Sequence, residues 1–264
     1  MNALLYNIFD SHAHYTDSRY NEDRDELLWT LPQLGVTGIL TCGSDVPDSE
    51  AALALADKYN FIYAACGVHP HEAKDFDETA KRKLPQLLSH PKCIALGEIG
   101  LDYHYDFSPR NTQKEVFCYQ LALAKEIGKP VVLHDREAHA DTLQLVREAG
   151  NTRGVIHAFS GGSALAFEWL ALGYALGFGG PVTFKPKKGE AMNMPLSVAA
   201  QIPLDRILLE TDAPYLTPHP YRGKRNDSAM IAYVAETIAA ARNMNPQELL
   251  DISADNAKRI FGVE

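Results

Sequence analysis

Cysteine is scarce in this chain of 264 residues, which has only four, and no two of them form a Cys-x-x-Cys pair. Cys42, Cys66 and Cys93 lie in apolar runs that are typical of strands. Buried, reduced thiols are the simplest explanation of this pattern. We therefore expect a cytoplasmic protein.

Long hydrophobic runs and an excess of basic charge are also lacking. No window approaches the roughly 20 apolar residues of a membrane span, and the amino terminus has no basic segment with a long apolar stretch after it. The sequence thus predicts neither membrane insertion nor secretion. Its 25 Lys and Arg residues are outnumbered by 34 Asp and Glu residues, for a net charge of -9. This balance argues against a broad basic face for nucleic acid, but not against a nuclease whose cations lie in its site.

Short apolar and β-branched runs recur along the chain and predict eight strands, at residues 8–11, 37–42, 61–66, 93–98, 131–134, 155–158, 174–178 and 207–210. Segments of helical periodicity separate them, and several end at a glycine, such as Gly128 or Gly150. Eight βα units in about 250 residues are typical of a TIM barrel, and no nucleotide-binding glycine turn follows the first strand. We predict an α/β fold, a (β/α)8 TIM barrel with extra C-terminal helices, as a single domain over residues 1–264.

Metal-ligand residue types stand at the ends of several predicted strands. A His-x-His pair, His12 and His14, follows the first strand and can present two imidazoles to one ion. The carboxyl ends of barrel strands meet at one rim, so side chains from different strands converge there. A hydrogen-bonded histidine or a solvated carboxylate would explain any one of these residues, but six at one rim predict a metal centre. The six are His12, His14, Glu98, His134, His157 and Asp212.

Two divalent ions fit this ligand set if Glu98 bridges them, because each ion then has three or four protein ligands. Mixed imidazole and carboxylate ligation suits Zn²⁺, Mn²⁺ or Fe²⁺, whereas Mg²⁺ and Ca²⁺ prefer an all-oxygen cage. The sequence does not fix the metal, and Mg²⁺, Mn²⁺ and Zn²⁺ all stay open. A metal pair activates water and holds the oxygens of an electrophile, so we predict a hydrolase. Asp212 and Glu98 are the candidate catalytic carboxylates, and Asp212 could accept the proton of the water. Glu210 and Asp10 lie two residues before ligands and are interpreted as orienting or substrate-binding groups.

Five motifs carry a resemblance to a known family. They are FDSHAH at residues 9–14, GVHP at 67–70, GEIGLDY at 97–103, HAFSG at 157–161 and LETDAPYL at 209–216. Together they resemble the TatD-type metal-dependent deoxyribonucleases over nearly the whole chain. The resemblance implies an amidohydrolase-like TIM barrel that uses two divalent ions to hydrolyse phosphodiester bonds of DNA, often as a 3′ to 5′ exonuclease. Single-stranded DNA is the expected substrate.

The resemblance also implies roles for single residues. His12, His14, Glu98 and Asp212 would bind one ion, and Glu98, His134 and His157 the other, while His69 and Glu210 would lie beside the substrate phosphate. Arg222 and Lys224 match a basic stretch that the family has after the eighth strand, and they could engage flanking phosphates. A solvated loop is the plainer interpretation of that stretch.

Rim aromatics and the remaining histidines are less distinctive. Tyr103, Tyr105, Phe159 and Tyr215 either stack on bases or pack against the rim. Five further histidines have no position that requires a metal role, and we expect them at the surface or in loops: His71, His90, His104, His139 and His219.

An amidohydrolase or lactonase acting on a small cyclic amide or ester is the main alternative. Many barrel amidohydrolases bridge their metals with a carboxylated lysine at the end of the fourth strand, where this chain has Glu98. Glu98 therefore favours the nuclease. A binding protein without catalysis is disfavoured by the complete ligand set, and no feature of the sequence predicts an obligatory protein partner.

Overall fold

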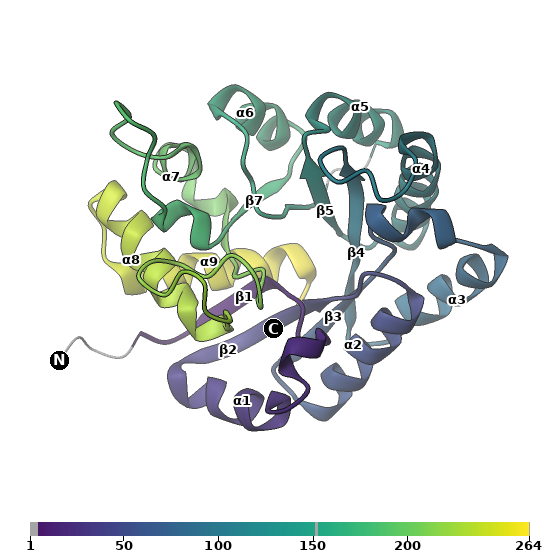
Figure 1. The fold of residues 1–264 in the computed structure, drawn as a ribbon, viewed down its shortest axis with the longest axis horizontal. Coiled ribbons are helices and arrows are strands. Elements are labelled where there is room, and N and C mark those ends of the chain that lie inside the picture. The colour runs from purple at the N-terminus through teal and green to yellow at the C-terminus, as the bar shows by residue number, and fades with distance from the viewer. Residues whose placement is uncertain (1–4, 151–152, 264) are drawn as a thin grey trace.

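The computed structural model describes residues 5–150 and 153–263, and within them the chain alternates between strands and helices (Figure 1). The strands are β1 (Ile8–Ala13), β2 (Val36–Cys42), β3 (Ile62–Cys66), β4 (Cys93–Asp102), β5 (Val131–Arg136), β6 (Gly154–Ile156), β7 (Ala175–Phe178) and β8 (Ile207–Leu209). The α-helices are α1 (Arg24–Thr30), α2 (Val46–Lys58), α3 (Glu78–Leu88), α4 (Arg110–Ile127), α5 (His139–Ala149), α6 (Ser163–Ala171), α7 (Met194–Ala199), α8 (Ile231–Arg242) and α9 (Pro246–Phe261). Short 3-10 segments are η1 (Ser18–Tyr20), η2 (Leu31–Leu34), η3 (Pro70–Asp75), η4 (Gly180–Thr183), η5 (Leu204–Arg206) and η6 (Ser228–Met230).

The eight strands form one parallel sheet in the order β1-β2-β3-β4-β5-β6-β7-β8. The first and last strands meet where Ala13 and Ala213 form a parallel bridge. There the backbone N–H of His14 donates to the carbonyl of Ala213 at 2.7 Å, and that of Asp212 donates to the carbonyl of His12 at 2.9 Å. The sheet is thus a nearly closed barrel, which confirms the predicted TIM-barrel fold. Residues 1–4, 151–152 and 264 of the predicted domain lie outside the described residues.

Caps that can be read from the sequence set the ends of several helices. Asp45 accepts the N–H of Asp48 at the start of α2, and Asp77 accepts two N–H groups at the start of α3, each at 2.7–2.8 Å. At the other end, Gly128 and Gly150 close α4 and α5 with a φ of 70°. Glycine adopts this left-handed conformation at little cost, so the two predicted helix ends are confirmed.

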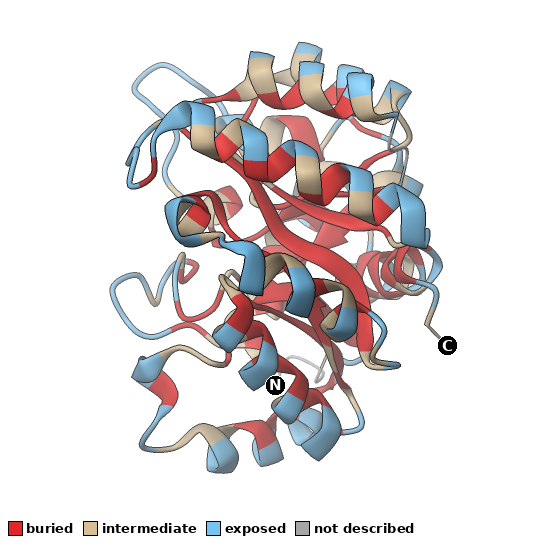
Figure 2. Ribbon diagram, turned by 90° about the vertical axis from the view of Figure 1, so that its right-hand side faces the viewer, coloured by how far each residue is buried: buried red, intermediate tan, exposed pale blue. Residues whose placement is uncertain are grey.

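The inside of the barrel is apolar at one end and polar at the other. Val132 and Val155 belong to a buried cluster that also contains Phe261 of α9. This helix therefore covers the end of the barrel where the strands begin. Side chains two residues further along a strand face the same way, so His134 and His157 also turn inward, at the ends where β5 and β6 finish. In Figure 2 the outer helices turn buried residues toward the strands and exposed residues outward.

Five strands end at other residues than predicted, and two of these differences bear most on the site. β1 and β5 each run two residues further, to Ala13 and Arg136, and β8 ends one residue earlier, at Leu209. The fourth strand continues to Asp102, four residues beyond the predicted end, and all of its residues are buried. The sixth ends at Ile156, so that His157 and Ala158 lie in the turn that follows it. Both differences move polar residues relative to the rim, where the site forms.

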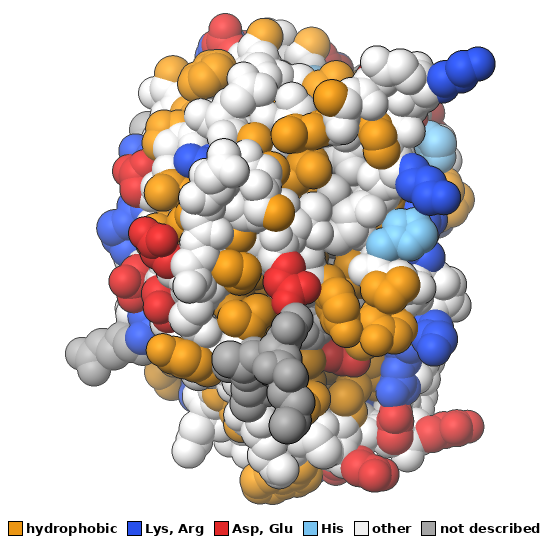
Figure 3. Space-filling model, turned by 90° about the vertical axis from the view of Figure 1, so that its left-hand side faces the viewer, with side chains coloured by type: hydrophobic (Ala, Val, Ile, Leu, Met, Phe, Trp, Pro, Cys, Tyr) orange, Lys and Arg blue, Asp and Glu red, His pale blue; other side chains and the backbone are white. Residues whose placement is uncertain are grey.

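The outer surface carries charges of both signs. On the face that Figure 3 shows, Lys and Arg side chains lie mainly along the edges, and hydrophobic and uncharged side chains fill the middle. Within residues 5–150 and 153–263, no helix has the length and apolar character needed to cross a membrane.

Candidate metal centre

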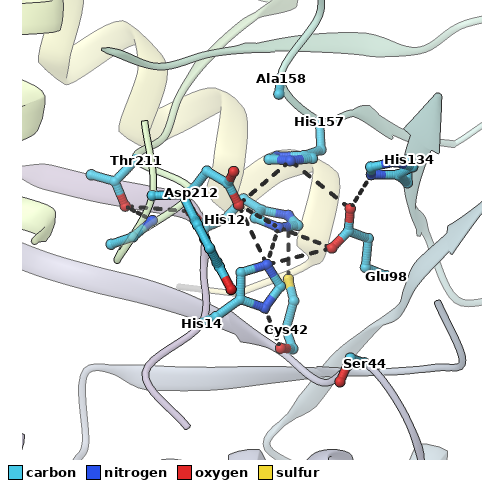
Figure 4. Close-up of polar contacts among 12 residues, drawn as sticks. His12, His14, Cys42, Ser44, Glu98, His134, His157, Ala158, Thr211 and Asp212 are labelled. Carbon is cyan, nitrogen blue, oxygen red and sulfur yellow. Dashed lines mark hydrogen bonds and ion pairs between the residues drawn. The ribbon is translucent and has the colours of Figure 1, made fainter. Parts of the chain in front are cut away.

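Four of the predicted ligand residues surround one point at the carboxyl end of the barrel (Figure 4). His12 Nε2 lies 3.1 Å from His14 Nε2, 3.3 Å from Glu98 Oε2 and 3.7 Å from Asp212 Oδ1. His14 Nε2 lies 3.5 Å from Glu98 Oε2 and 3.4 Å from Asp212 Oδ1. Four donors placed about 2.1 Å from one ion in a tetrahedron would be about 3.4 Å apart. The donor atoms of His12, His14 and Asp212 therefore form a group that could hold one divalent ion, and Glu98 Oε2 lies beside its two imidazoles.

The other oxygen of Glu98 faces a second set of imidazoles. Glu98 Oε1 lies 2.8 Å from His134 Nδ1, 3.7 Å from His69 Nε2 and 3.9 Å from His157 Nε2. In Figure 4 Glu98 accordingly lies between His134 on one side and His12 and His14 on the other. This is the position that a bridging carboxylate needs. His69, expected beside the substrate phosphate, is thus also close enough to form a metal-binding group with Glu98 and His134.

Groups behind the imidazoles determine how two of the rings are turned. His14 Nδ1 lies 3.0 Å from the carbonyl oxygen of Cys42. Glu210 Oε1 lies 3.0 Å from His157 Nδ1 and accepts the backbone N–H of Ala158 at 2.6 Å. In both rings Nε2 is left to face the cluster, an arrangement typical of metal-binding histidines. Glu210 is buried and, in the described part of the chain, is not among the residues that line the cavity, which favours the orienting interpretation over contact with substrate.

Asp102 is a site residue that the sequence alone does not mark out. It is fully buried, and its Oδ2 lies 3.1 Å from His134 Nε2 and 2.9 Å from His71 Nε2. Its Oδ1 accepts the backbone N–H groups of His104 and Tyr105, each at 2.9 Å. Burial would raise the pKa of Asp102, but these hydrogen bonds hold it well below its usual range. The only signal in the sequence is its place in the GEIGLDY motif.

His71 lies in the connection between β3 and α3 and is in none of the candidate metal-binding groups of the described residues. This histidine is in η3, where its side chain is 21% exposed, bonds to Asp102 and lines the cavity above the cluster. The five residues after Gly67 do not resemble a strand, so periodicity says nothing about where the ring points.

Asp10, which was interpreted as an orienting group, instead ties the first strand to the segments around the eighth. It is buried and accepts the hydroxyls of Thr211 and Ser228 at 2.6 and 2.7 Å and the backbone N–H of Thr211 at 3.0 Å. Burial raises the pKa of Asp10 to about 7 against these hydrogen bonds. Its carboxylate holds the rim closed beside His12.

The carboxylates hold protons on three of the imidazoles. Burial alone would lower the pKa of a histidine, but the hydrogen bond to Asp212 and the charge of Glu98 raise the pKa of His14 to about 9. Against the same opposing burial, carboxylates raise the pKa of His134 to about 9 and that of His157 to about 10. Burial would raise the pKa of Glu98, but the neighbouring histidines hold it well below its usual range. A divalent ion bound here would have to displace these protons.

The cluster lies in a cavity of about 1190 Å³. Its lining includes five of the predicted ligands together with His69; the sixth ligand, His12, is fully buried beneath them. Arg222 and Lys224 are not among the described residues that line this cavity. The guanidinium of Arg222 lies 3.7 Å from the ring centroid of Phe184 instead. Their contact with substrate phosphates stays a prediction.

A parallel (β/α)8 barrel with imidazoles and carboxylates gathered at its carboxyl rim defines a metal-dependent hydrolase. The model of the TatD related DNase family matches residues 9–262, and the chain belongs to this family. The predicted resemblance and the predicted enzyme class are thus confirmed.

Individual relatives agree with this assignment. The chain is 42% identical to the uncharacterized metal-dependent hydrolase YabD of Bacillus subtilis, over 97% of this chain and 99% of that protein. It is 36% identical to the 3′-5′ ssDNA/RNA exonuclease TatD of Musicola paradisiaca, over 96% of this chain and 97% of the relative. Among solved structures, the TatD homologue YjjV of Escherichia coli superimposes with a TM-score of 0.91 at 30% identity, covering 98% of this chain and 99% of its own.

Proposed function

We propose that the protein hydrolyses the phosphodiester bonds of single-stranded nucleic acid, above all DNA, from the 3′ end, with two divalent ions and without an obligatory protein partner. One observation carries the proposal: Glu98 turns Oε2 toward His12 and His14 and Oε1 toward His134, in a chain of the TatD related DNase family. The Musicola relative, named as a 3′-5′ ssDNA/RNA exonuclease, supports the strand preference and the polarity.

On this proposal Glu98 would serve as a ligand to both ions. His12, His14 and Asp212 would complete the ligands of one ion, and His134 and His157 those of the other. When bound, such ions lower the pKa of water and offset negative charge on phosphate oxygens. The donors include four imidazole nitrogens, which favours Mn²⁺ or Zn²⁺ over Mg²⁺.

Asp212 is the side chain best placed to accept the proton of the attacking water. Its Oδ1 faces the Nε2 atoms of His14 and His157 at 3.4 and 3.7 Å, and its side chain is 17% exposed to the cavity. Burial would raise the pKa of Asp212, but these two histidines lower it, so the carboxylate is ionised near neutral pH. Glu98 is buried and ionised as well, and its two carboxylate oxygens face the two sets of donor atoms.

Hydrolysis of end-labelled oligonucleotides by the metal-reconstituted protein tests this function. We expect single-stranded DNA to shorten progressively from its 3′ end with Mn²⁺, Mg²⁺ or Zn²⁺, and duplex DNA to be a poorer substrate. His134→Ala and Asp212→Ala should each lower kcat/KM at least about 100-fold, since each removes a ligand from the cluster. His90→Ala is the matched control, because His90 lies before β4, at the opposite end of the barrel.

Full activity in either site variant would contradict the proposal. So would a wild-type protein that binds metal and hydrolyses small lactones or cyclic amides but no polynucleotide.

A further inference from the structure

Tyr105, Phe107 and Arg136 form a stacked wall on one side of the cavity, called the stacking wall below. The rings of Tyr105 and Phe107 are stacked, with centroids 5.2 Å apart and planes 21° apart. The Arg136 guanidinium lies 4.7 Å from the Tyr105 centroid. All three side chains line the cavity, and Tyr105 and Phe107 are 48% and 58% exposed. Large aromatic surface is therefore open beside the candidate metal centre.

The loop that carries the two rings is anchored from beneath. Asp102 accepts the backbone N–H of Tyr105, and the hydroxyl of Ser108 donates to the carbonyl of His71 at 2.7 Å. The same hydroxyl accepts the backbone N–H of Lys74 at 3.0 Å. Exposed rings on a loop held in this way are pre-organised, so a ligand that stacks on them loses little entropy to loop ordering.

The stacking wall begins one ring away from a candidate metal ligand. The ring of His71 lies 6.2 Å from that of His134 and packs edge-on against Phe107, with centroids 4.8 Å apart. A phosphate held at the ligand cluster would thus have aromatic surface on the far side of the His71 ring. This is where the base of the nucleotide that carries the phosphate, or of its neighbour, would lie.

Arg136 adds a guanidinium to the cavity at the stacking wall. Among the described residues that line it, Arg136 is the only Lys or Arg, and the described chain gives its guanidinium no carboxylate partner within ion-pair distance. A guanidinium that is free of protein carboxylates and already lies over an aromatic ring is well suited to a phosphate next to a stacked base.

We propose that the stacking wall binds a nucleobase of the single-stranded substrate against Phe107, with Arg136 contacting the adjacent phosphate. The inference rests on the proposed function and names the binding subsite. Every base has a π face, so such a site holds a strand with little regard to sequence. Bases in a duplex are stacked on one another and are not free to use it, which supplies a physical reason for a single-strand preference.

Oligonucleotides with one abasic position at successive distances from the 3′ end, combined with Phe107→Ala and Arg136→Gln, test the inference. Phe107→Ala should raise KM for the intact strand about 5- to 100-fold, with a smaller change in kcat. For the wild-type protein, KM should rise by the same factor when the abasic position is the one that occupies the subsite. For that abasic strand, Phe107→Ala should raise KM no further. Arg136→Gln should raise KM and reduce its dependence on salt.

Phe107→Trp should restore the wild-type KM, because it restores an aromatic face. Matched controls are Phe167→Ala on α6, an aromatic that is 51% exposed outside the cavity lining, and Arg82→Gln on the outer helix α3.

Two outcomes overturn the inference while leaving the proposed function intact. Phe107→Ala could leave KM unchanged, or it could weaken intact and abasic strands alike, as a purely structural residue would. If the wild-type protein cleaves no oligonucleotide, the proposed function fails. Fluorescence anisotropy with labelled intact and abasic single strands then tests base binding at the stacking wall without cleavage. Equal affinity of the protein for the two strands overturns the inference.

Discussion

Replacing Asp102 with asparagine should weaken one of the two proposed ion sites and leave the barrel folded. Oδ1 of Asp102 accepts two backbone N–H groups, and the amide oxygen of asparagine can do the same. Oδ2 lies 3.1 Å from His134 Nε2 and 2.9 Å from His71 Nε2. An amide nitrogen there would meet two N–H groups. To avoid this, His134 must carry its proton on Nδ1, the nitrogen that faces Glu98 at 2.8 Å and would bind the ion.

The expected loss of metal affinity and of stability follows from the contacts of the two carboxylate oxygens of Asp102. Removing the carboxylate partner of a metal-binding histidine costs about 10- to 100-fold in affinity, or roughly 1.4–2.7 kcal/mol. Asp102→Ala should do more, because it also leaves the two N–H groups of the following loop without their acceptor. A buried donor without a partner costs roughly 1–3 kcal/mol, so the alanine variant should lose stability as well as affinity.

Calorimetric titration with Mn²⁺ and thermal unfolding of the metal-free proteins separate the two variants. Asp102→Asn should bind one ion as the wild type does and one ion 10- to 100-fold more weakly, as derived above, with little change in Tm. Asp102→Ala should show the same binding defect and a lower Tm. Asp205→Asn is the control, since Asp205 is 67% exposed and far from the rim, in η5 before β8. Two ions bound to Asp102→Asn with wild-type affinity would refute the reasoning, as would equal weakening of both sites.

Two further predictions concern protons and packing. Raising the pH from 7 toward 9 should tighten ion binding. Burial alone would lower the pKa of the histidines, but carboxylates raise the pKa of His14 and His134 to about 9 and that of His157 to about 10. An ion must displace the protons that these histidines still hold at pH 7. Titration calorimetry in buffers of different ionisation enthalpy should detect proton release at pH 7, and a pH-independent affinity would contradict it. Phe261→Ala in α9 should lower the free energy of unfolding by about 3–5 kcal/mol, because Phe261 is buried in the barrel interior. Denaturant unfolding measures this against the exposed Phe167→Ala, and a loss no larger than that of the control would show that α9 does not support the barrel.

The strand count, the fold and the gathering of the six candidate ligands could be predicted from the sequence. Each strand is a local pattern, a short apolar run bounded by turn residues, and such patterns survive without knowledge of distant contacts. The convergence of His12, Glu98 and Asp212 follows from the same fact, because the carboxyl ends of parallel barrel strands meet at one rim whatever the loops do. Family motifs then narrowed the chemistry from a general metal site to a nuclease.

Only the tertiary structure decided the features that depend on how side chains and loops are turned. Asp102 contacts both His134 and His71 because three segments far apart in the chain meet at its carboxylate. The stacking wall exists because Tyr105 and Arg136, from the loop after β4 and the end of β5, face the same cavity. Loop direction and ring orientation arise from long-range hydrogen bonds and packing, and these leave no periodic trace in a sequence. The sequence by itself therefore determined the barrel and the identities of the candidate metal ligands, while their surroundings and the position of substrate-facing groups required the folded chain.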